Sequence, residues 1–336
     1  MGRLKNKIRG IVFERLSDNQ IDSFYKIYYK VRYPHELMKN MSYGDLNEDK
    51  TLYLIRPKVD GTEGLMSLLV NVLRHIYYAQ ENDYIPFVDF ENYHTQYDDF
   101  INGNKNSWEF YFTQPSNLTL TEVYQSKNVV LSGLDMKISN KSFFKQNFDD
   151  QSLISLHNFM FKYIDFNSDV KLKVDNEIKK LGINTSETLG LYLRGTDYIK
   201  LKPAGHPVQP TSKQAIKVVD DFIKKHDDIT KIFLVTEDGE IYKEIKQKYK
   251  DKCVVVTFDS FINDYDGKNF LSHTSSINEL DDSPYIRGLN YLIKIVILSK
   301  CGYFVGGNTM GSWASLIFSG DGYKEKYVFD LGMYGK

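Results

Sequence analysis

The spacing of apolar residues in the first half of the chain is mixed. Apolar residues recur at helical spacing over 21–31 and 62–80, whereas short apolar runs occupy 51–57 and 84–90. A period of about 3.6 residues is typical of an amphipathic helix, and a short apolar run between turn residues is typical of a strand. This half is therefore predicted to combine helices and strands.

The second half follows a stricter order. After a long helical pattern over 150–180, short apolar runs alternate with helical segments. The predicted strands are 188–193, 231–236, 253–258, 302–307 and 326–331, and the predicted helices are 211–225, 239–249, 285–300 and 309–319. Such alternation requires crossover connections, which produce a parallel sheet with helices on both faces. We predict an α/β protein of two domains, residues 1–165 and a Rossmann-like domain over 166–336.

Composition excludes several classes of protein. Of the 336 residues, 42% are hydrophobic and 14% aromatic, which is unlike a disordered chain. Lys plus Arg (43) balance Asp plus Glu (44), so the net charge of -1 gives no reason to expect a nucleic-acid partner. Cys253 and Cys301 lack metal-ligand spacing and are expected to be buried thiols. Neither a secretory signal nor an apolar run of about 18 residues is present, so a cytoplasmic protein is expected.

Polar residues follow three of the predicted strands. The candidates for ligand binding are Arg194, Thr196, Glu237, Asp238, Gly306, Gly307, Asn308, Thr309 and Ser312. Ligands of open parallel sheets bind beyond the carboxyl ends of the strands. A guanidinium can hold a phosphate through two hydrogen bonds, and the free N–H groups of a helix start favour an anion. Together these residues predict a diphosphate pocket.

Each of these signals also has a purely structural interpretation. Arg194 and Asp197 could form an ion pair that organises the loop, and Glu237 and Asp238 could be ordinary helix caps. The residues around Thr309 could simply form a tight turn. His206, in a proline-rich loop, is a candidate general base or a residue that orders this loop.

The order and spacing of these motifs resemble the donor-binding half of the fucosyltransferase-like superfamily. The matching segments are "YLRGTDY", "GHPVQPTSKQAIKVVDDF", "IFLVTEDGEIYKEIKQKY" and "LIKIVILSKCGYFVGGNTMGSWASLIF", and the glycine-containing "DGTEGLMSLLVNVLRHIYYAQENDYIPFVDF" is similar to the first strand-to-helix turn. The superfamily includes alpha-1,6-fucosyltransferases, nodulation fucosyltransferases, protein O-fucosyltransferases and bacterial surface-polysaccharide glycosyltransferases. The resemblance covers about two thirds of the chain.

This resemblance implies a GT-B fold, in which two Rossmann-like domains face a cleft. It further implies an inverting transfer, without a metal or other cofactor, from a nucleotide sugar, GDP-fucose in the characterised members. Arg194 matches the arginine that holds the donor diphosphate, Asp197 the acid of the same motif, and Thr309 a phosphate-binding hydroxyl. The expected acceptor is a glycan or a lipid-linked oligosaccharide, which is compatible with peripheral association at the inner face of the membrane and with surface-polysaccharide synthesis.

The chain departs from the superfamily at four positions. Tyr192 replaces a histidine, Gly195 a second arginine, Lys202 the proposed glutamate base of the core alpha-1,6 enzymes, and Lys294 an acid that reads the nucleotide base. An unperturbed lysine is a poor base. The candidates for the catalytic base are therefore His206, Asp197 and Glu63.

Three alternatives stay open from the sequence. The chain could bind a sugar nucleotide without catalysis, use another nucleotide-sugar donor, or be a different Rossmann-like enzyme, although the dinucleotide and Walker fingerprints are missing. Asp264-Tyr265-Asp266 superficially matches a metal-binding DxD motif, but it lies in the long polar loop over 259–282 and not directly after a strand, so no metal is expected there.

Overall fold

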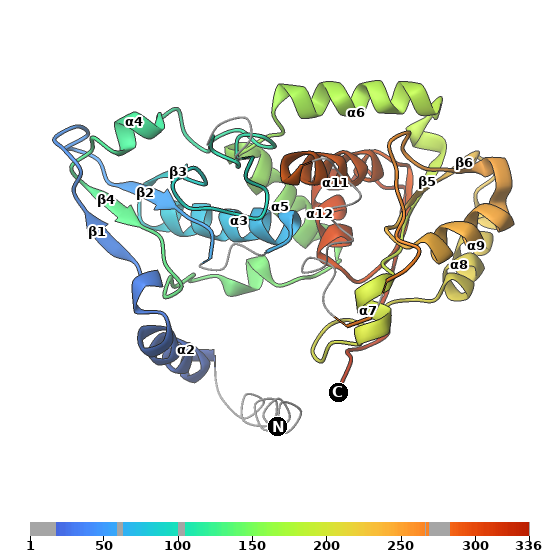
Figure 1. Cartoon of the computed structure of the whole chain (residues 1–336), viewed down its shortest axis with the longest axis horizontal. Helices are drawn as coiled ribbons and strands as arrows, with labels where there is room; N and C mark the ends of the chain where they lie inside the picture. Colours follow the sequence, from blue (N-terminus) through green and yellow to red (C-terminus); the bar gives the residue numbers. More distant parts are fainter. Residues whose placement is uncertain (1–17, 59–62, 100–104, 266, 269–282, 336) are drawn as a thin grey trace. The chain divides into compact units, whose positions relative to one another are not determined.

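The computed structural model describes residues 18–58, 63–99, 105–265, 267–268 and 283–335 (Figure 1). The chain divides into two compact units. The first unit comprises Met1–Glu63, Val70–Thr95 and Gln114–Lys141, and the second comprises Gly64–Leu69, Gln96–Thr113 and Ser142–Lys336. Residues 142–165, which the predicted boundary assigns to the first domain, therefore lie with the second unit.

The first unit is built on a four-stranded sheet in the order β1-β4-β2-β3. Its elements are α2 (Asp18–Arg32), β1 (Lys39–Met41), β2 (Leu52–Ile55), α3 (Leu65–Glu81, whose first turn belongs to the second unit), β3 (Ile85–Val88), α4 (Leu120–Val123) and β4 (Val129–Leu131). β2 is parallel to both β3 and β4, whereas β1 is antiparallel to β4. The sequence analysis did not predict β1 and β4, because three residues are too few to show the alternation of apolar and polar residues that marks a strand.

The second unit contains a five-stranded sheet in the order β7-β6-β5-β8-β9, and every neighbouring pair in it is parallel. Its strands are β5 (Thr188–Tyr192), β6 (Lys231–Val235), β7 (Cys253–Val254), β8 (Tyr303–Gly307) and β9 (Glu325–Phe329). Strands β5 and β8 are buried along their whole length, as expected for a parallel sheet covered on both faces. The predicted α/β class and the Rossmann-like second half are confirmed.

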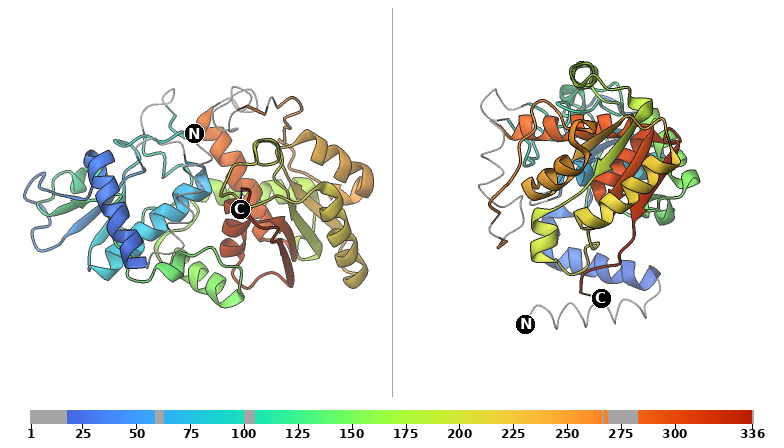
Figure 2. Two further views of the ribbon diagram at one scale, coloured as in Figure 1. Left: turned by 90° about the horizontal axis from the view of Figure 1, so that it is seen from below. Right: turned by 90° about the vertical axis from the view of Figure 1, so that its right-hand side faces the viewer.

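Helices cover this sheet (Figure 2). The helices of this unit are α5 (Asp150–Tyr163), α6 (Ser168–Leu181), α7 (Thr196–Leu201), α8 (Ser212–Lys225), α9 (Gly239–Tyr249), α11 (Pro284–Ser299) and α12 (Met310–Ser319). Helices α8, α9 and α11 contact strands of the sheet, whereas α6 packs against α11 and α5 packs against α12. Short 3-10 helices occur at Pro34–Glu36 (η1), Lys141–Phe144 (η2), Thr185–Glu187 (η3) and Lys250–Lys252 (η4). Cys253 and Cys301 are both free and buried, as predicted, and burial raises the pKa of Cys253 to about 11. In the part of the chain that is described, no helix combines the length and the apolar character needed to cross a bilayer.

Three predicted elements need correction. The helix predicted over 150–180 is two helices, because Asn167 interrupts it and caps α6 with its side chain. The strand predicted over 253–258 pairs with β6 only at Cys253 and Val254. The loop after β5 contains a short helix, α7. Most of the predicted loop over 259–282, including Asp266, lies outside the described residues.

Candidate functional site

The strand order of the second unit defines where its ligand site is expected. From the central strand β5, the chain adds β6 and β7 on one side and later β8 and β9 on the other. The order therefore reverses between β5 and β8, and open parallel sheets bind ligands beyond the carboxyl ends of the strands at such a reversal. Tyr192 pairs with Val235 of β6 and with Gly306 of β8, so the three strand ends meet as predicted.

Arg194 follows β5 and is held by two carboxylates. Its Nη2 lies 3.2 and 3.3 Å from the two carboxylate oxygens of Asp197, and its Nε lies 3.7 Å from Oε1 of Glu237. Its guanidinium carbon lies 4.9 Å from the centre of the Tyr198 ring. The predicted ion pair with Asp197 is confirmed. The side chain nevertheless remains 26% exposed, so the same pair can aim the guanidinium at a ligand.

Arg194 keeps its positive charge in this setting. Burial lowers the pKa of Arg194, but the nearby Glu237 and Asp197 carboxylates outweigh this effect and raise the pKa well above its usual value. The site therefore contains a fixed positive charge at every accessible pH.

Glu237 and Asp238, which follow β6, hold the turn between Gly195 and Thr196. Oε1 of Glu237 accepts hydrogen bonds from the Gly195 N–H at 3.0 Å and from the Thr196 hydroxyl at 2.9 Å. Oδ2 of Asp238 accepts from the Thr196 N–H at 3.0 Å. Thr196 has a φ of 41°, a left-handed conformation that a β-branched residue rarely adopts. The two carboxylates thus stabilise a strained turn directly beside Arg194.

Asp238 also caps a helix, as the structural interpretation predicts. Its Oδ1 accepts hydrogen bonds from the N–H groups of Glu240 and Ile241 at 2.9 and 3.1 Å, at the start of α9. One carboxylate therefore fixes both the beginning of α9 and the turn after β5. In this structure Glu237 and Asp238 position other groups, and a direct contact with a ligand stays a prediction.

The position of the Asp238 side chain explains why residue 195 is a glycine. A Cβ atom at Gly195 would lie 2.3 Å from Oδ2 and 2.5 Å from Cβ of Asp238. No side chain fits there while Asp238 occupies its place, so the second arginine of the superfamily motif is sterically excluded in this conformation.

The turn between β8 and α12 is held by its own hydroxyls. The Thr309 side chain accepts a hydrogen bond from the Ser312 N–H at 3.1 Å and caps α12. The Ser312 hydroxyl is fully buried and donates to the Gly307 carbonyl at 2.5 Å. Ser312 therefore holds the turn together, and the ligand contact predicted for it stays a prediction. Asn308 accepts a hydrogen bond from Gln146 at 2.9 Å through its side-chain oxygen.

Gln209 was missed by the sequence analysis, although it connects two parts of the site. Its side-chain amide donates to the Pro207 carbonyl at 3.1 Å and to the Asn308 carbonyl at 3.2 Å. Its Oε1 is buried and has no hydrogen-bond partner among the described residues, and a Cβ at Gly307 would lie 2.3 Å from it. The sequence signal that could have identified Gln209 is its place between Pro207 and Pro210, where a polar side chain is held in a rigid loop. The contact ties the His206 loop to the end of β8.

Two tyrosines lie beside the start of α12. The Tyr192 and Tyr291 hydroxyls lie 3.3 Å apart, and a Cβ at Gly311 would lie 2.5 Å from the Tyr291 oxygen and 2.7 Å from Cε1 of Tyr192. Burial raises the pKa of both tyrosines, so both stay protonated near neutral pH. Tyr192 thus replaces the histidine of the superfamily motif with a neutral aromatic group, and Tyr291 was not predicted.

Of the three predicted bases, His206 has the most suitable surroundings. Its Nδ1 lies 3.4 Å from the Tyr198 hydroxyl, whose ring stacks on Arg194. Burial lowers the pKa of His206, and Arg194 lowers it further against an opposite effect of Asp197. The imidazole is therefore neutral near pH 7, which a proton acceptor requires.

The other two predicted bases are engaged in contacts. Asp197 is buried, pairs with Arg194 and accepts a hydrogen bond from the Tyr198 N–H at 3.0 Å. Glu63 belongs to the first unit, where it forms a 2.6 Å ion pair with Lys58. Both therefore have clear structural roles.

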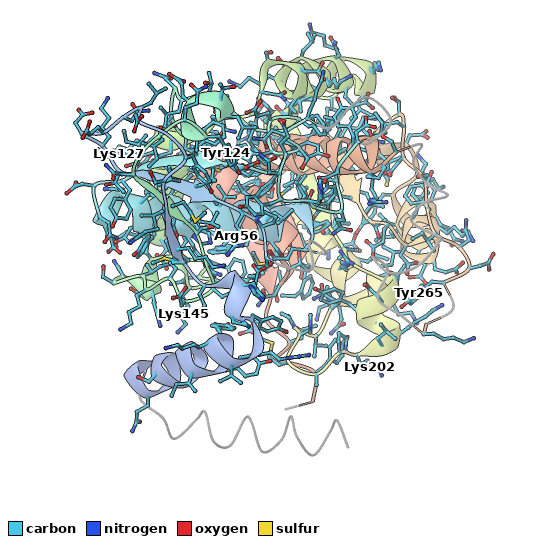
Figure 3. All side chains as sticks on the ribbon, turned by 60° about the vertical axis from the view of Figure 1, so that its left-hand side comes forward. Arg56, Tyr124, Lys127, Lys145, Lys202 and Tyr265 are labelled. Carbon is cyan, nitrogen blue, oxygen red and sulfur yellow. The ribbon has the colours of Figure 1, made fainter. Side chains whose placement is uncertain are left out.

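The two lysines at superfamily positions behave differently from each other. Lys202 directly follows α7, has a φ of 46° and is exposed (Figure 3). Figure 3 also labels Tyr265, whose carbonyl accepts a 2.6 Å hydrogen bond from Lys200 of α7. Lys294 forms a buried ion pair with Asp259, which comes from the segment after β7. A carboxylate is thus present beside position 294 although the residue itself is a lysine.

Arg56 of the first unit, like Arg194, comes shortly after a buried strand, but the two guanidinium groups make different contacts. It follows β2 directly and is labelled in Figure 3. Its guanidinium donates to the carbonyls of Ser132, His35 and Leu37 at 2.9 to 3.4 Å, and the side chain is buried. Arg56 therefore organises backbone, whereas Arg194 is partly open to solvent.

No protein-family model and no curated protein sequence matches the chain. Several solved structures are similar to it. They include the selenomethionyl fucosyltransferase NodZ from Bradyrhizobium (12% identity, 85% of this chain and 97% of that chain covered, TM-score 0.47) and NodZ alpha-1,6-fucosyltransferase co-crystallised with GDP (12%, 84% and 95%, 0.47). POFUT1 in complex with GDP-fucose is similar at 9% identity, with 84% and 74% covered and a TM-score of 0.37. At these identities and TM-scores, the activity of the chain has to be inferred from its own residues.

Proposed function

We propose that this protein is a glycosyltransferase that uses a nucleotide-sugar donor, with GDP-fucose as the first candidate. One observation carries the proposal: a permanently charged, partly exposed arginine follows β5 at the strand-order reversal, where the neighbouring strand β8 leads into the start of the ten-residue helix α12. A guanidinium and a helix start both favour a phosphate. The resemblance of the surrounding motifs to the fucosyltransferase-like superfamily supports GDP-fucose as the first candidate for the donor.

In the proposed reaction, an acceptor hydroxyl attacks the anomeric carbon of the sugar from the face opposite the nucleotide. The bond from this carbon to the diphosphate oxygen breaks, and the diphosphate leaves with its electron pair. Arg194 and the N–H groups at the start of α12 would stabilise the charge that develops on the leaving group. We propose that no metal ion is needed, because these groups can take the role of a cation.

His206 is the proposed base that accepts the acceptor's proton. Its neutral state near pH 7 and its hydrogen bond to Tyr198, whose ring stacks on Arg194, support this role. We further propose that Asp259, which forms an ion pair with Lys294, contributes to the choice of nucleotide base. A glycan or lipid-linked oligosaccharide of bacterial surface-polysaccharide synthesis is the proposed acceptor class.

Calorimetric titration with GDP, UDP, CDP and ADP in the presence of EDTA tests the donor site. Wild-type protein should bind GDP selectively, and Arg194→Ala should weaken binding by about 100-fold, because a charge-assisted bidentate contact is lost. Arg194→Lys is the matched control that keeps the charge, and it should lie between the two. Binding of another nucleotide would change the donor, and binding of none would contradict the proposal.

Transfer assays separate catalysis from mere binding. Incubation of GDP-fucose with glycan acceptors should release GDP, and the anomeric configuration of the product, read by NMR, should be inverted. His206→Ala should lower turnover by about 100-fold or more while leaving GDP affinity nearly unchanged. Full turnover in this variant would assign the base elsewhere. GDP binding without any turnover would favour the alternative of a non-catalytic sugar-nucleotide-binding protein.

A further inference from the structure

The last part of α2 presents apolar side chains to solvent. Among the described residues, eight large hydrophobic side chains are exposed, and three of them, Ile27, Tyr28 and Val31, lie within five consecutive positions of this helix. Ile27 is 65% exposed and Val31 is 79% exposed. Residues four apart lie on the same face of a helix, so Ile27 and Val31 form a continuous apolar stripe.

The exposure of this stripe is unexpected from the sequence. Apolar residues at helical spacing over 21–31 predict a helix that buries one face. In the structure, the predicted face is open to solvent at Val31. Neighbouring exposed apolar side chains on one helix are typical of an interaction surface.

Positive charge gathers at the same end of the chain. The first 32 residues contain eight Lys and Arg against three Asp and Glu, a net charge of +5, so the remaining residues carry -6 of the total of -1. Lys30 and Arg32 in the last turn of α2 are both exposed and flank Val31. An apolar stripe beside basic residues matches an anionic bilayer surface, where the stripe enters the interface and the basic groups meet lipid phosphates.

We propose that the exposed stripe of α2 and its flanking basic residues bind the surface of an anionic phospholipid membrane. The basic residues that carry the proposal are Lys30 and Arg32, which are exposed on either side of Val31 in the last turn of α2. The proposal does not depend on the donor site, since α2 belongs to the first unit and the described donor residues belong to the second.

Vesicle flotation of the full chain tests this proposal. Wild-type protein should float with vesicles of phosphatidylglycerol and phosphatidylcholine, and not with phosphatidylcholine alone, and the binding should fall as NaCl rises from about 0.1 to 0.5 M. Ile27→Glu/Val31→Glu and Lys30→Ser/Arg32→Ser should each lower the bound fraction at least about tenfold. Leu172→Glu, at an apolar residue of α6 that is 59% exposed, is the matched control and should bind like wild type.

Three results would overturn the proposal. The first is absence of binding to anionic vesicles, or equal binding by all variants. The second is a change from dimer to monomer in Ile27→Glu/Val31→Glu by light scattering, which would assign the stripe to a second copy of the chain. The third is a marked loss of Tm in that variant with vesicle binding retained, which would mean that another part of the same chain covers the stripe. The far-UV circular dichroism spectrum of each variant serves as a check on folding.

Discussion

Glu237 is the residue whose ionisation should matter most at the candidate site. Burial raises the pKa of Glu237, although Arg194 and the Thr196 hydroxyl act in the opposite direction. Together with Asp197, it places two carboxyl groups beside the positive charge of Arg194. A bound diphosphate would add further negative charge, which favours the protonated form of Glu237.

This arrangement predicts that nucleotide binding takes up a proton. The protonated form of Glu237 is favoured by burial and again by the ligand, so affinity for GDP should be highest at low pH and should fall as pH rises through the raised pKa. The fall should not exceed about tenfold per pH unit, the limit for one proton. Calorimetry between about pH 5 and 8 in buffers of different ionisation enthalpy measures both the affinity and the proton uptake.

Glu237→Gln tests the origin of this pH dependence. Glutamine keeps an oxygen that can accept from the Gly195 N–H and the Thr196 hydroxyl, but it cannot ionise. The variant should bind GDP with little pH dependence and more tightly than wild type at pH 8. Glu240→Gln, an exposed neighbour on α9, should retain the wild-type profile. An unchanged slope in Glu237→Gln would show that another group takes up the proton.

The break between α5 and α6 shows how a single polar residue determines element boundaries. The Asn167 side chain accepts from the Val170 N–H at 2.8 Å, and its amide donates to the carbonyls of Glu109 and Phe110 at 2.9 and 2.7 Å. Asn167→Ala should therefore lower the free energy of unfolding by about 2–3 kcal/mol, more than the loss of one cap.

Urea unfolding measures this effect, and Asn184→Ala provides the comparison. Asn184 caps only the short η3 and is exposed, so its substitution should cost no more than about 1 kcal/mol. Equal losses in the two variants would mean that the contacts of Asn167 with residues 109 and 110 contribute nothing.

Local patterns in the sequence predict elements well where a cap or a period is visible. Thr211 and Gln214 form the capping box that starts α8, and Asp238 caps α9 at the predicted position. The break at Asn167 was missed because apolar spacing continues through residues 150–180, while the two carbonyls that accept from the Asn167 amide lie more than fifty residues away. The hydrogen bond that Asp238 accepts from the Thr196 N–H was missed because Thr196 lies 42 residues earlier in the chain.

At the scale of the whole molecule, topology adds what local patterns omit. The sequence predicts that strand ends carry Arg194, Glu237 and Thr309, and the structure places these ends side by side. Only the structure reveals that the order in which strands are added to the sheet reverses between the parallel strands β5 and β8. Sequence also cannot reveal that Asp238 fills the space above Gly195, or that Gln209 joins two loops, because both are long-range contacts.

This topology predicts where a nucleotide should protect the chain from hydrogen exchange. At about 100 times its Kd, GDP should slow exchange by up to about 100-fold at amides whose opening requires release of the ligand. Such amides should lie in the turns after β5 and β8, residues 194–198 and 307–313, and the strands of the first unit's sheet should change less. Mass spectrometry of peptides from wild type and Arg194→Ala measures this difference, and the mutant should lose the protection at both turns together. Protection centred on β2 and β3 would instead place the nucleotide in the first unit and separate Arg194 from donor binding.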